Sequence, residues 1–226
     1  MTSGRLQESY RIGSPDYLAK QLGERGITRL LEIVCSAYAI LYENRTVEPE
    51  MSEDEITEEL FKEIVFVWSK SSIPKTVIPI NQKIDKANAK DRGRPPTIDF
   101  CFRDRWVKEA FFGFECKLLA EGDNRLCKEY IDNGLCRYLQ GKYCAGGSAG
   151  SMIGYINSGS IIAVVQNVKI RVDKEKALRP MTLASAIYAF KEHYVSMHER
   201  EKGLSSFIVH HLFLYFAADS VKSSID

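Results

Sequence analysis

The stretch PPTIDFCF (residues 95–102), followed by AFFGFECKLL (residues 110–119), decides the fold of this chain. Both segments are apolar and rich in aromatic side chains, which predicts two β-strands. Residues two apart on a strand face the same side, so Glu115 and Lys117 project together while Cys116 points into the opposite layer. If the two strands pair, an acid on the first lies across the ladder from them. The pattern predicts two carboxylates and one ammonium at a single point of a sheet.

This combination of side chains suits the hydrolysis of a phosphodiester. A bound Mg²⁺ ion makes hydroxide near neutral pH and stabilises charge on the non-bridging oxygens. It prefers oxygen ligands and keeps several waters, so Asp99, Glu115 and the backbone carbonyl of Cys116 form a sufficient candidate set. We expect Lys117 to orient the attacking water or to stabilise the developing negative charge.

The segments PPTID, which ends at Asp99, and FECK, which contains Glu115 and Lys117, resemble the motif of the restriction-endonuclease-like PD-(D/E)xK nuclease superfamily. The resemblance covers the motif and an α-β-β-β-α-β order from about residue 52 to residue 156. It implies an α/β (α+β) fold, with a restriction-endonuclease-like mixed β-sheet core flanked by helices. It also implies a metal-dependent deoxyribonuclease that uses Mg²⁺, for which Mn²⁺ can substitute, with RNA a less favoured substrate.

Two more positions follow from the same resemblance. Related nucleases often place an acid of the helix before the first strand in the metal site, and Glu59 or Glu63 is the candidate here. They also often carry a polar residue on the helix after the second motif strand, which makes Arg137 or Gln140 a candidate to reach the substrate.

Chance is the alternative explanation of the motif. With 27% charged residues, an acid-x-Lys triplet can arise on a solvated face, and an Asp at a strand end often only caps a turn. The chain also departs from the superfamily pattern, because Thr97-Ile98 separates Pro96 from Asp99. Against chance, Glu115-Cys116-Lys117 is the only acid-x-Lys triplet of the sequence and lies in an apolar strand that would normally avoid charge.

Two functional alternatives come from other classes of protein. The first is a non-catalytic module that keeps the nuclease fold as a nucleic-acid or protein docking subunit. An intact acid, acid and lysine set disfavours it, because a retired site has no reason to retain buried charge. The second is a cysteine hydrolase that uses Cys35 or Cys144 with His198 or His210, and no residue spacing supports it.

Length and composition indicate an ordinary globular protein. With 226 residues and 45% hydrophobic residues, the chain supports one sizeable core, so we expect a single nuclease domain over residues 1–226. Within it we expect an N-terminal extension (1–26), a nuclease core (52–156), and C-terminal helices and a hairpin that complete the sheet (157–226). No stretch has the length of a membrane span and no signal peptide is evident, which predicts a cytoplasmic protein.

Periodicity predicts the remaining elements. Helical spacing recurs over residues 27–43, over a helix opened by the N-cap Ser52, and over residues 124–140. A short strand is expected at SMIGYI, and two helices at SIIAVVQNVKIRVDK and TLASAIYAFKEH. The segments YVSMHER and SFIVHHLFLYFA indicate a hairpin that extends the sheet or caps its edge. His198, His210 and His211 are expected in the core rather than on a metal, and most of the six cysteines as small buried hydrophobes.

Charge gives no global attraction to nucleic acid, because 31 basic residues face 30 acidic ones. A local patch is the candidate DNA-binding surface, and a solvated loop is the alternative. It consists of Lys83, Lys86, Lys90, Arg92 and Arg94. No phosphate-binding Gly-x-x-x-x-Gly-Lys-Ser/Thr motif and no base-reading motif occurs. We therefore expect a partner ATPase or targeting subunit, possible self-association, and, by resemblance, a role as effector in a prokaryotic defence or restriction system.

Overall fold

The computed structural model describes residues 18, 21–23, 25–84, 97–108, 110–184, 187, 190–201 and 203–217, with the backbone alone at 83 and 84. The α-β-β-β-α-β order predicted for residues 52–156 is found. In chain order the elements are α3 (Thr28–Asn44), α4 (Glu53–Lys70), β1 (Val77–Ile84), β2 (Thr97–Asp104), β3 (Phe111–Ala120), α5 (Asn124–Tyr130), the π-helical turn η2 (Ile131–Leu135), α6 (Cys136–Leu139), β4 (Ala149–Ser158), α7 (Ile161–Val172), β5 (Ala177–Leu183), β6 (His193–His198) and β7 (Phe207–Tyr215).

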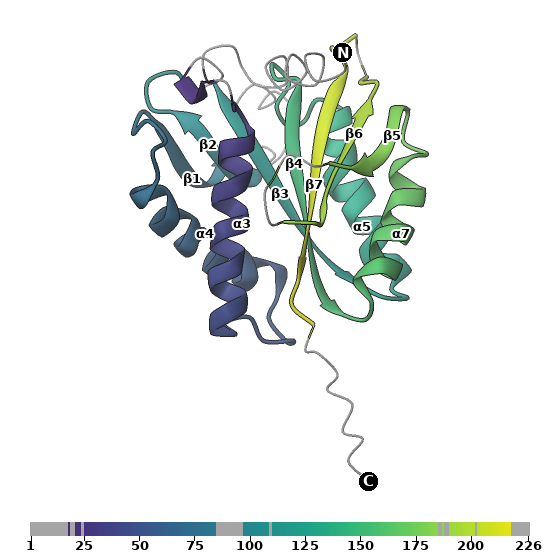
Figure 1. Ribbon diagram of the computed structural model, residues 1–226. Helices are drawn as coiled ribbons and strands as arrows, with labels where there is room; N and C mark the ends of the chain where they lie inside the picture. The colour runs from purple at the N-terminus through teal and green to yellow at the C-terminus, as the bar shows by residue number, and fades with distance from the viewer. Residues whose placement is uncertain are drawn as a thin grey trace, which may run out of the picture.

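One seven-stranded mixed sheet joins these elements, in the order β1-β2-β3-β4-β7-β6-β5 (Figure 1). β1, β2 and β3 are antiparallel neighbours, β4 runs parallel to both β3 and β7, and β7, β6 and β5 are again antiparallel. The predicted pairing of the strands that carry Asp99 and Glu115 is confirmed, because β2 and β3 are adjacent. The fold class is thus mixed α/β, as predicted.

Helices cover both faces of the sheet, with α3 and α4 on one face and α5 and α7 over the other (Figure 1). Phe112, Phe114 and Cys116 of β3 belong to the core under α3 and α4. Phe111 and Leu119 belong to the core under α5 and α7. This alternation confirms the prediction that Cys116 points into the layer opposite its two charged neighbours.

A capping box begins α4 at Ser52, which the sequence predicts as the N-cap. The Ser52 hydroxyl accepts a hydrogen bond from the N–H of Glu55 at 3.3 Å, and the Glu55 carboxylate accepts one from the N–H of Ser52 at 2.8 Å. The box satisfies two backbone donors that a helix start leaves without an intrahelical partner. It also fixes the first helical residue, Glu53, at the end of α4 that approaches β3.

The helix predicted over residues 182–193 is wrong for the part that the structure describes. Its first residues belong to β5 and its last to β6, and these two strands pair antiparallel. Leu183, Ile187 and Phe190 have helical spacing, but pairing with a neighbouring strand overrides this local pattern. β5 also contains Pro180, which argues against a strand except at the edge of a sheet, where β5 lies.

The predicted C-terminal hairpin is confirmed, and it completes the sheet through β7 rather than capping it from outside.

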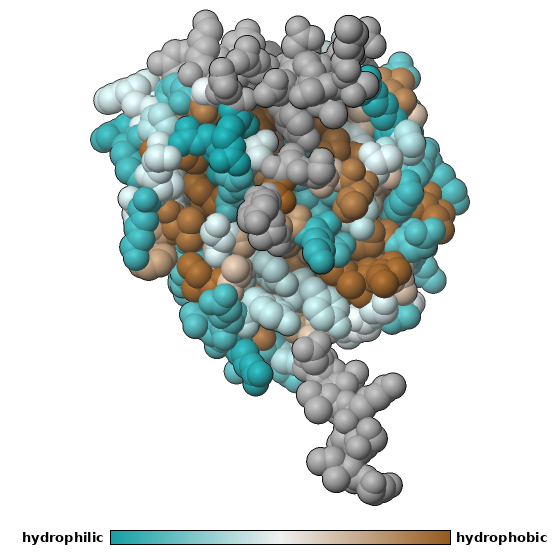
Figure 2. Space-filling view, in the orientation of Figure 1, coloured by the Kyte–Doolittle hydropathy of each residue, from teal (hydrophilic) through white to brown (hydrophobic). Residues whose placement is uncertain are grey.

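On the face shown in Figure 2, hydrophobic and hydrophilic side chains are interspersed. Among the described residues, no helix is both long enough and apolar enough to cross a membrane.

Candidate active site

β2 and β3 separate at the place where the acids lie. The backbone ladder between them ends at the pair Phe100–Phe114, next to Asp99. Beyond this point the N–H of Cys116 donates to Asp99 Oδ2 at 2.6 Å, and the N–H of Leu118 donates to Glu53 Oε2 at 3.0 Å. Two carboxylates therefore accept the bonds that a continuing strand would have accepted. The divergence of the strands opens the sheet and lines the opening with acids.

Lys117 lies between these carboxylates. Its Nζ is 2.6 Å from Glu53 Oε1, 3.3 Å from Glu115 Oε1 and 2.5 Å from the carbonyl oxygen of Cys116, and its side chain is 11% exposed. Burial alone lowers the pKa of the ammonium, but Glu115, Glu53 and Asp99 outweigh burial and raise the pKa above its ordinary value. Lys117 is thus a fixed cation at neutral pH and not a base. We call Glu53, Asp99, Glu115 and Lys117 the acid–lysine cluster.

Glu115 is the most deeply buried member of the acid–lysine cluster, with 1% of its surface exposed. Burial, followed by the charge of Asp99, raises the pKa of its carboxyl to about 8. The cations Lys117 and Arg137 lie 3.3 and 3.4 Å from Oε1, beyond the 2.7–2.9 Å typical of a strong charge-assisted bond. They offset burial only in part, and we therefore take the carboxyl to be largely protonated at neutral pH despite its two ion-pair contacts. Oε2 is buried and has no hydrogen-bond partner among the described residues.

Asp99 is half-buried and faces the same opening. Burial raises the pKa of its carboxyl, while Lys117 and the hydrogen bond from the N–H of Cys116 lower it. The charge of Asp99 raises the pKa of Glu115. The structure therefore brings together Asp99, Glu115 and Lys117 as the sequence predicts, with the two acids close enough to repel each other.

Arg137 joins the acid–lysine cluster from the helix that follows β3. Its Nη1 is 3.4 Å from Glu115 Oε1 and also donates to the hydroxyl of Tyr143. The Tyr143 hydroxyl in turn donates to the carbonyl of Thr97 at 3.0 Å. Of the two polar residues predicted on this helix, Arg137 reaches the acids, whereas Gln140 forms the C-cap of α6.

A π-helical turn shapes this helix. The turn lies between α5 and α6 and contains Gly134. A Cβ atom at this glycine would lie 2.3 Å from Cε of Met152, so the missing side chain lets the helix lie close to β4. π-turns frequently occur at functional sites.

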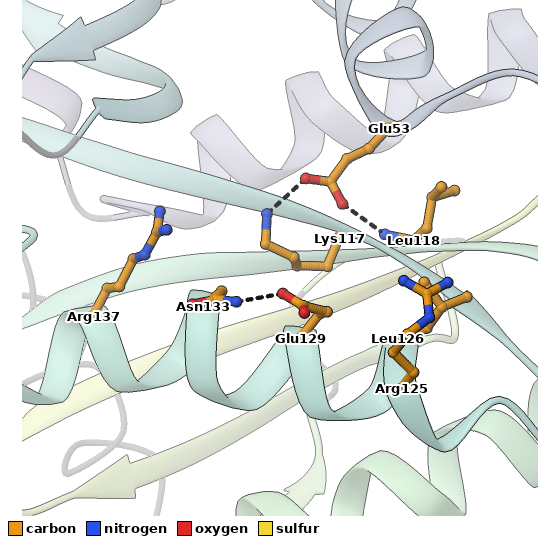
Figure 3. A pocket seen from close by; sticks show the side chains of 8 residues that line it. All are labelled: Glu53, Lys117, Leu118, Arg125, Leu126, Glu129, Asn133 and Arg137. Carbon is orange, nitrogen blue, oxygen red and sulfur yellow. Dashed lines mark hydrogen bonds and ion pairs between the residues drawn. The ribbon is translucent and has the colours of Figure 1, made fainter. Parts of the chain in front are cut away.

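A cavity of about 440 Å³ lies beside the acid–lysine cluster (Figure 3). Glu53, Lys117 and Leu118 line one wall of it. The helix of residues 124–139 lines the other, and Arg137 stands at one end of that wall. The cavity is open to solvent, which gives a ligand access to the ammonium of Lys117.

The acid that α4 contributes differs from the two predicted. Glu53 contacts Lys117, whereas Glu59 pairs with Lys62 on the same helix at 2.7 Å, and Glu63 lies one turn further along and is half-buried. Glu53 belongs to an acidic first turn, together with Asp54 and Glu55. Such a turn is common at a helix start because it compensates the helix dipole, so it does not by itself indicate an active-site acid.

The predicted basic patch lies outside what the structure describes. Lys86, Lys90, Arg92 and Arg94 fall in the undescribed segment 85–96, and of Lys83 only the backbone, paired with Ile98 in the β1–β2 ladder, is placed.

The residues of the cysteine-hydrolase alternative lie in the packed interior. Cys35 and Cys144 belong to different cores on opposite faces of the sheet. Burial raises the pKa of the Cys35 thiol, the reverse of what a nucleophilic cysteine needs. His198 and His210 are buried on β6 and β7, as expected for core histidines.

The acid–lysine cluster fits a Mg²⁺ ion by the chemistry of its donors. Two carboxylates and several waters are enough for this ion, and the unpartnered Oε2 of Glu115 is the kind of buried oxygen that a cation would satisfy. The described residues contain no group of three or more His, Cys, Asp or Glu side chains arranged around a metal. Asp99 and Glu115, which meet where β2 and β3 diverge, would be the side-chain ligands. The third predicted ligand, the backbone carbonyl of Cys116, accepts a hydrogen bond from the ammonium of Lys117.

Comparison with known proteins adds no family assignment: no protein-family model, no curated protein and no solved structure matches the chain.

Proposed function

We propose that this chain is a Mg²⁺-dependent nuclease that hydrolyses phosphodiester bonds of DNA. The observation that carries the proposal is the convergence of Asp99, Glu115 and Lys117 where two adjacent strands diverge. One oxygen of Glu115 is buried there without a hydrogen-bond partner in the described part of the chain. The order α4-β1-β2-β3-α5-β4, with three antiparallel strands followed by a parallel one, supports assignment to the restriction-endonuclease-like fold.

The roles of the residues follow from their contacts. When bound, Mg²⁺ would supply an activated water and stabilise negative charge on the phosphate. Asp99 and Glu115 would hold the ion, and the charge of the ion would favour the ionised form of Glu115. Lys117, held by Glu53, keeps its proton and would stabilise charge that develops on the phosphate oxygens. Arg137 would contribute a second positive charge from the opposite wall.

A non-catalytic docking module is the second candidate, and a specific observation favours it. Asp99 and Glu53 accept hydrogen bonds from backbone N–H groups of β3, so they have a structural task without any metal. Glu115 is the residue that separates the two functions. Among the described residues its carboxyl caps no backbone group and its Oε2 has no hydrogen-bond partner, which costs stability unless a ligand uses this oxygen.

The deciding assay incubates the purified chain with plasmid, linear and single-stranded DNA in Mg²⁺, in Mn²⁺ and in EDTA. We expect cleavage with either metal and none in EDTA. Glu115→Gln should abolish cleavage and leave the thermal midpoint equal or higher, because the amide resembles the protonated carboxyl. Glu43→Gln, at an exposed position of α3, is the matched control. Metal-independent cleavage, or full activity of Glu115→Gln, would exclude the proposed site.

The biological setting extends this proposal. We expect the chain to act as the effector of a prokaryotic defence or restriction system, with an ATPase or targeting subunit as partner. The isolated chain should then cut weakly or indiscriminately and gain activity in the complex. Sedimentation and cleavage with and without the products of neighbouring genes test this, and strong sequence-specific cleavage by a monomer contradicts it.

A further inference from the structure

Four polar residues, each four positions from the next, line the helical wall of the cavity: Arg125, Glu129, Asn133 and Arg137. Figure 3 shows their side chains along one side of the helix, with Arg125 and Arg137 at opposite ends. In a regular α-helix, steps of four residues rotate steadily around the axis. The wider π-turn between residues 131 and 135 reduces this rotation, which helps to keep the row on one face.

The middle of this row is a ready-made hydrogen-bonding pair. The side-chain amide of Asn133 donates to Oε2 of Glu129, and this pair lies between the two arginines (Figure 3). Because the amide N–H is directed to the carboxylate, Glu129 Oε1 and the side-chain oxygen of Asn133 remain as acceptors. Two neighbouring acceptors match an exocyclic amino group, which carries two N–H donors.

The remaining lining suits the other parts of a nucleotide. Leu118 and Leu126 supply apolar surface for a base or sugar, and the Arg125 side chain is 74% exposed at the outer end, where a phosphate can meet it. The volume of about 440 Å³ suits a group of nucleotide size and not a duplex. Lys117 lies in the facing wall, so a nucleotide in the cavity is next to the acid–lysine cluster.

We infer that the cavity binds an unpaired nucleotide of a DNA strand adjacent to the scissile phosphate, and that the Glu129–Asn133 pair selects a base with an exocyclic amino group. Cytosine, adenine and guanine carry such a group, whereas thymine has none and presents carbonyl oxygens that the two acceptors repel. Placement beside the scissile phosphate rests on the proposed nuclease function. The preference among bases is a property of the cavity and can be measured without cleavage.

The test measures fluorescence anisotropy of labelled dC, dA and dT hexanucleotides with the full chain in EDTA. Wild type should bind the dC and dA hexamers about 5-fold or more tightly than the dT hexamer, the lower end of discrimination for a good base contact. Glu129→Gln replaces one acceptor with a donor and should bring the ratio to about 1. Asn133→Ala, which removes the other acceptor, should also reduce it. Glu58→Gln, on exposed α4 surface and paired with Lys62, should keep the wild-type ratio.

Equal affinity of wild type for the three hexamers overturns the inference, and so does a preference that survives in both Glu129→Gln and Asn133→Ala. The same hexamers with Mg²⁺ separate this result from the proposed function. Cleavage without base preference leaves the nuclease standing and removes the selective cavity. Base-selective binding without cleavage supports the cavity and removes the nuclease.

Discussion

Two clusters of buried polar side chains lie on the same sheet. They differ in how fully their polar atoms are hydrogen-bonded. The acid–lysine cluster is charged, opens into a cavity and leaves an oxygen of Glu115 without a partner among the residues that the structure describes. The other cluster lies under β6 and β7, and we call it the histidine network. It consists of Tyr130, Ser196, His198 and His211.

The histidine network is a continuous chain of hydrogen bonds. The Tyr130 hydroxyl lies 2.8 Å from His211 Nδ1, and Ser196 Oγ lies 2.8 Å from His211 Nε2 and 2.7 Å from His198 Nε2. The chain ends at the carbonyl of Glu175, 2.6 Å from His198 Nδ1. Burial lowers the pKa of both histidines and keeps them neutral.

The contrast teaches how to separate structural from functional polarity. In the histidine network both nitrogens of each ring have partners, which is what packing and specificity require of buried polar groups. In the acid–lysine cluster burial disfavours the ionised form of Glu115 and raises its pKa, and one of its carboxyl oxygens has no hydrogen-bond partner among the described residues. A buried group that its surroundings do not satisfy is a better candidate for chemistry than one that they do.

Among the variants that test this contrast, Lys117→Met, in the acid–lysine cluster, should have the largest effect. Loss of a preorganised cation should reduce Mg²⁺-dependent cleavage by about 10²- to 10³-fold. Affinity for DNA in EDTA should change much less, because one phosphate contact is a small share of the total. Single-turnover cleavage and anisotropy measure the two quantities. Lys128→Met, at an exposed position of α5, is the control, and equal losses in both variants would show a general charge effect.

Acidification should reduce the contribution of the buried histidine His193 to the unfolding free energy. Burial lowers the pKa of His193 from 6.5 to about 4, so between these values the unfolded chain binds a proton that the folded chain does not. The contribution of His193 to the unfolding free energy is therefore fully present above pH 6.5. It falls as the pH drops toward 4, by on the order of 3 kcal/mol. Urea unfolding of wild type and His193→Gln at pH 7, 6 and 5 measures the loss as the difference between the two proteins. This difference cancels the opposite contribution of Glu115, whose raised pKa adds stability as the pH falls. A difference that does not change with pH contradicts the assignment.

Ser196→Ala should separate stability from chemistry. The hydroxyl bridges His198 and His211, and its removal leaves buried ring nitrogens without partners. We expect a loss of about 1–3 kcal/mol in unfolding free energy. Cleavage per folded molecule should stay at the wild-type level. A fully folded variant that has lost activity would show that the two clusters are coupled.

Glu53→Gln should have the smallest effect. The amide oxygen can still accept the N–H of Leu118, but Lys117 loses its closest carboxylate while keeping Glu115 and the carbonyl of Cys116. Cleavage should fall roughly tenfold, or about 1.4 kcal/mol in barrier height. Stability should change by less than about 1 kcal/mol. A loss of activity as large as that of Lys117→Met would move Glu53 from a positioning role to a direct one.

The sequence predicted the parts of the fold in which local pattern and tertiary context agree. The helix at 28–44, the N-cap at Ser52, the strand pair and the C-terminal hairpin all have sequence patterns that match their final packing. The strand β5 was missed because its Pro180 argues against a strand and because the apolar residues after it have helical spacing.

The part of the candidate site that depends on the geometry of one strand was predictable from the sequence. The part that depends on how separate elements pack against each other was not. The two-residue spacing places Glu115 and Lys117 on one face whatever else the chain does. The choice among the acids of α4 depends on how far the helix start reaches along β3, which periodicity does not encode. Arg137 was one of two candidates, because a sequence does not reveal a π-turn that changes the direction of the residues after it.

That π-turn has a consequence for how the chain tolerates changes in length. A π-turn holds about one residue more than an α-turn, so removal of Asp132 would restore a regular helix. Every side chain beyond that point would then rotate by about 100° around the helix axis. Arg137 would turn away from Glu115, and Tyr138 would leave the carbonyls of Gly113 and Ser151 to which it donates. The alignment of the two cavity walls thus depends on one additional residue, and a single-codon deletion is a more damaging change here than most substitutions.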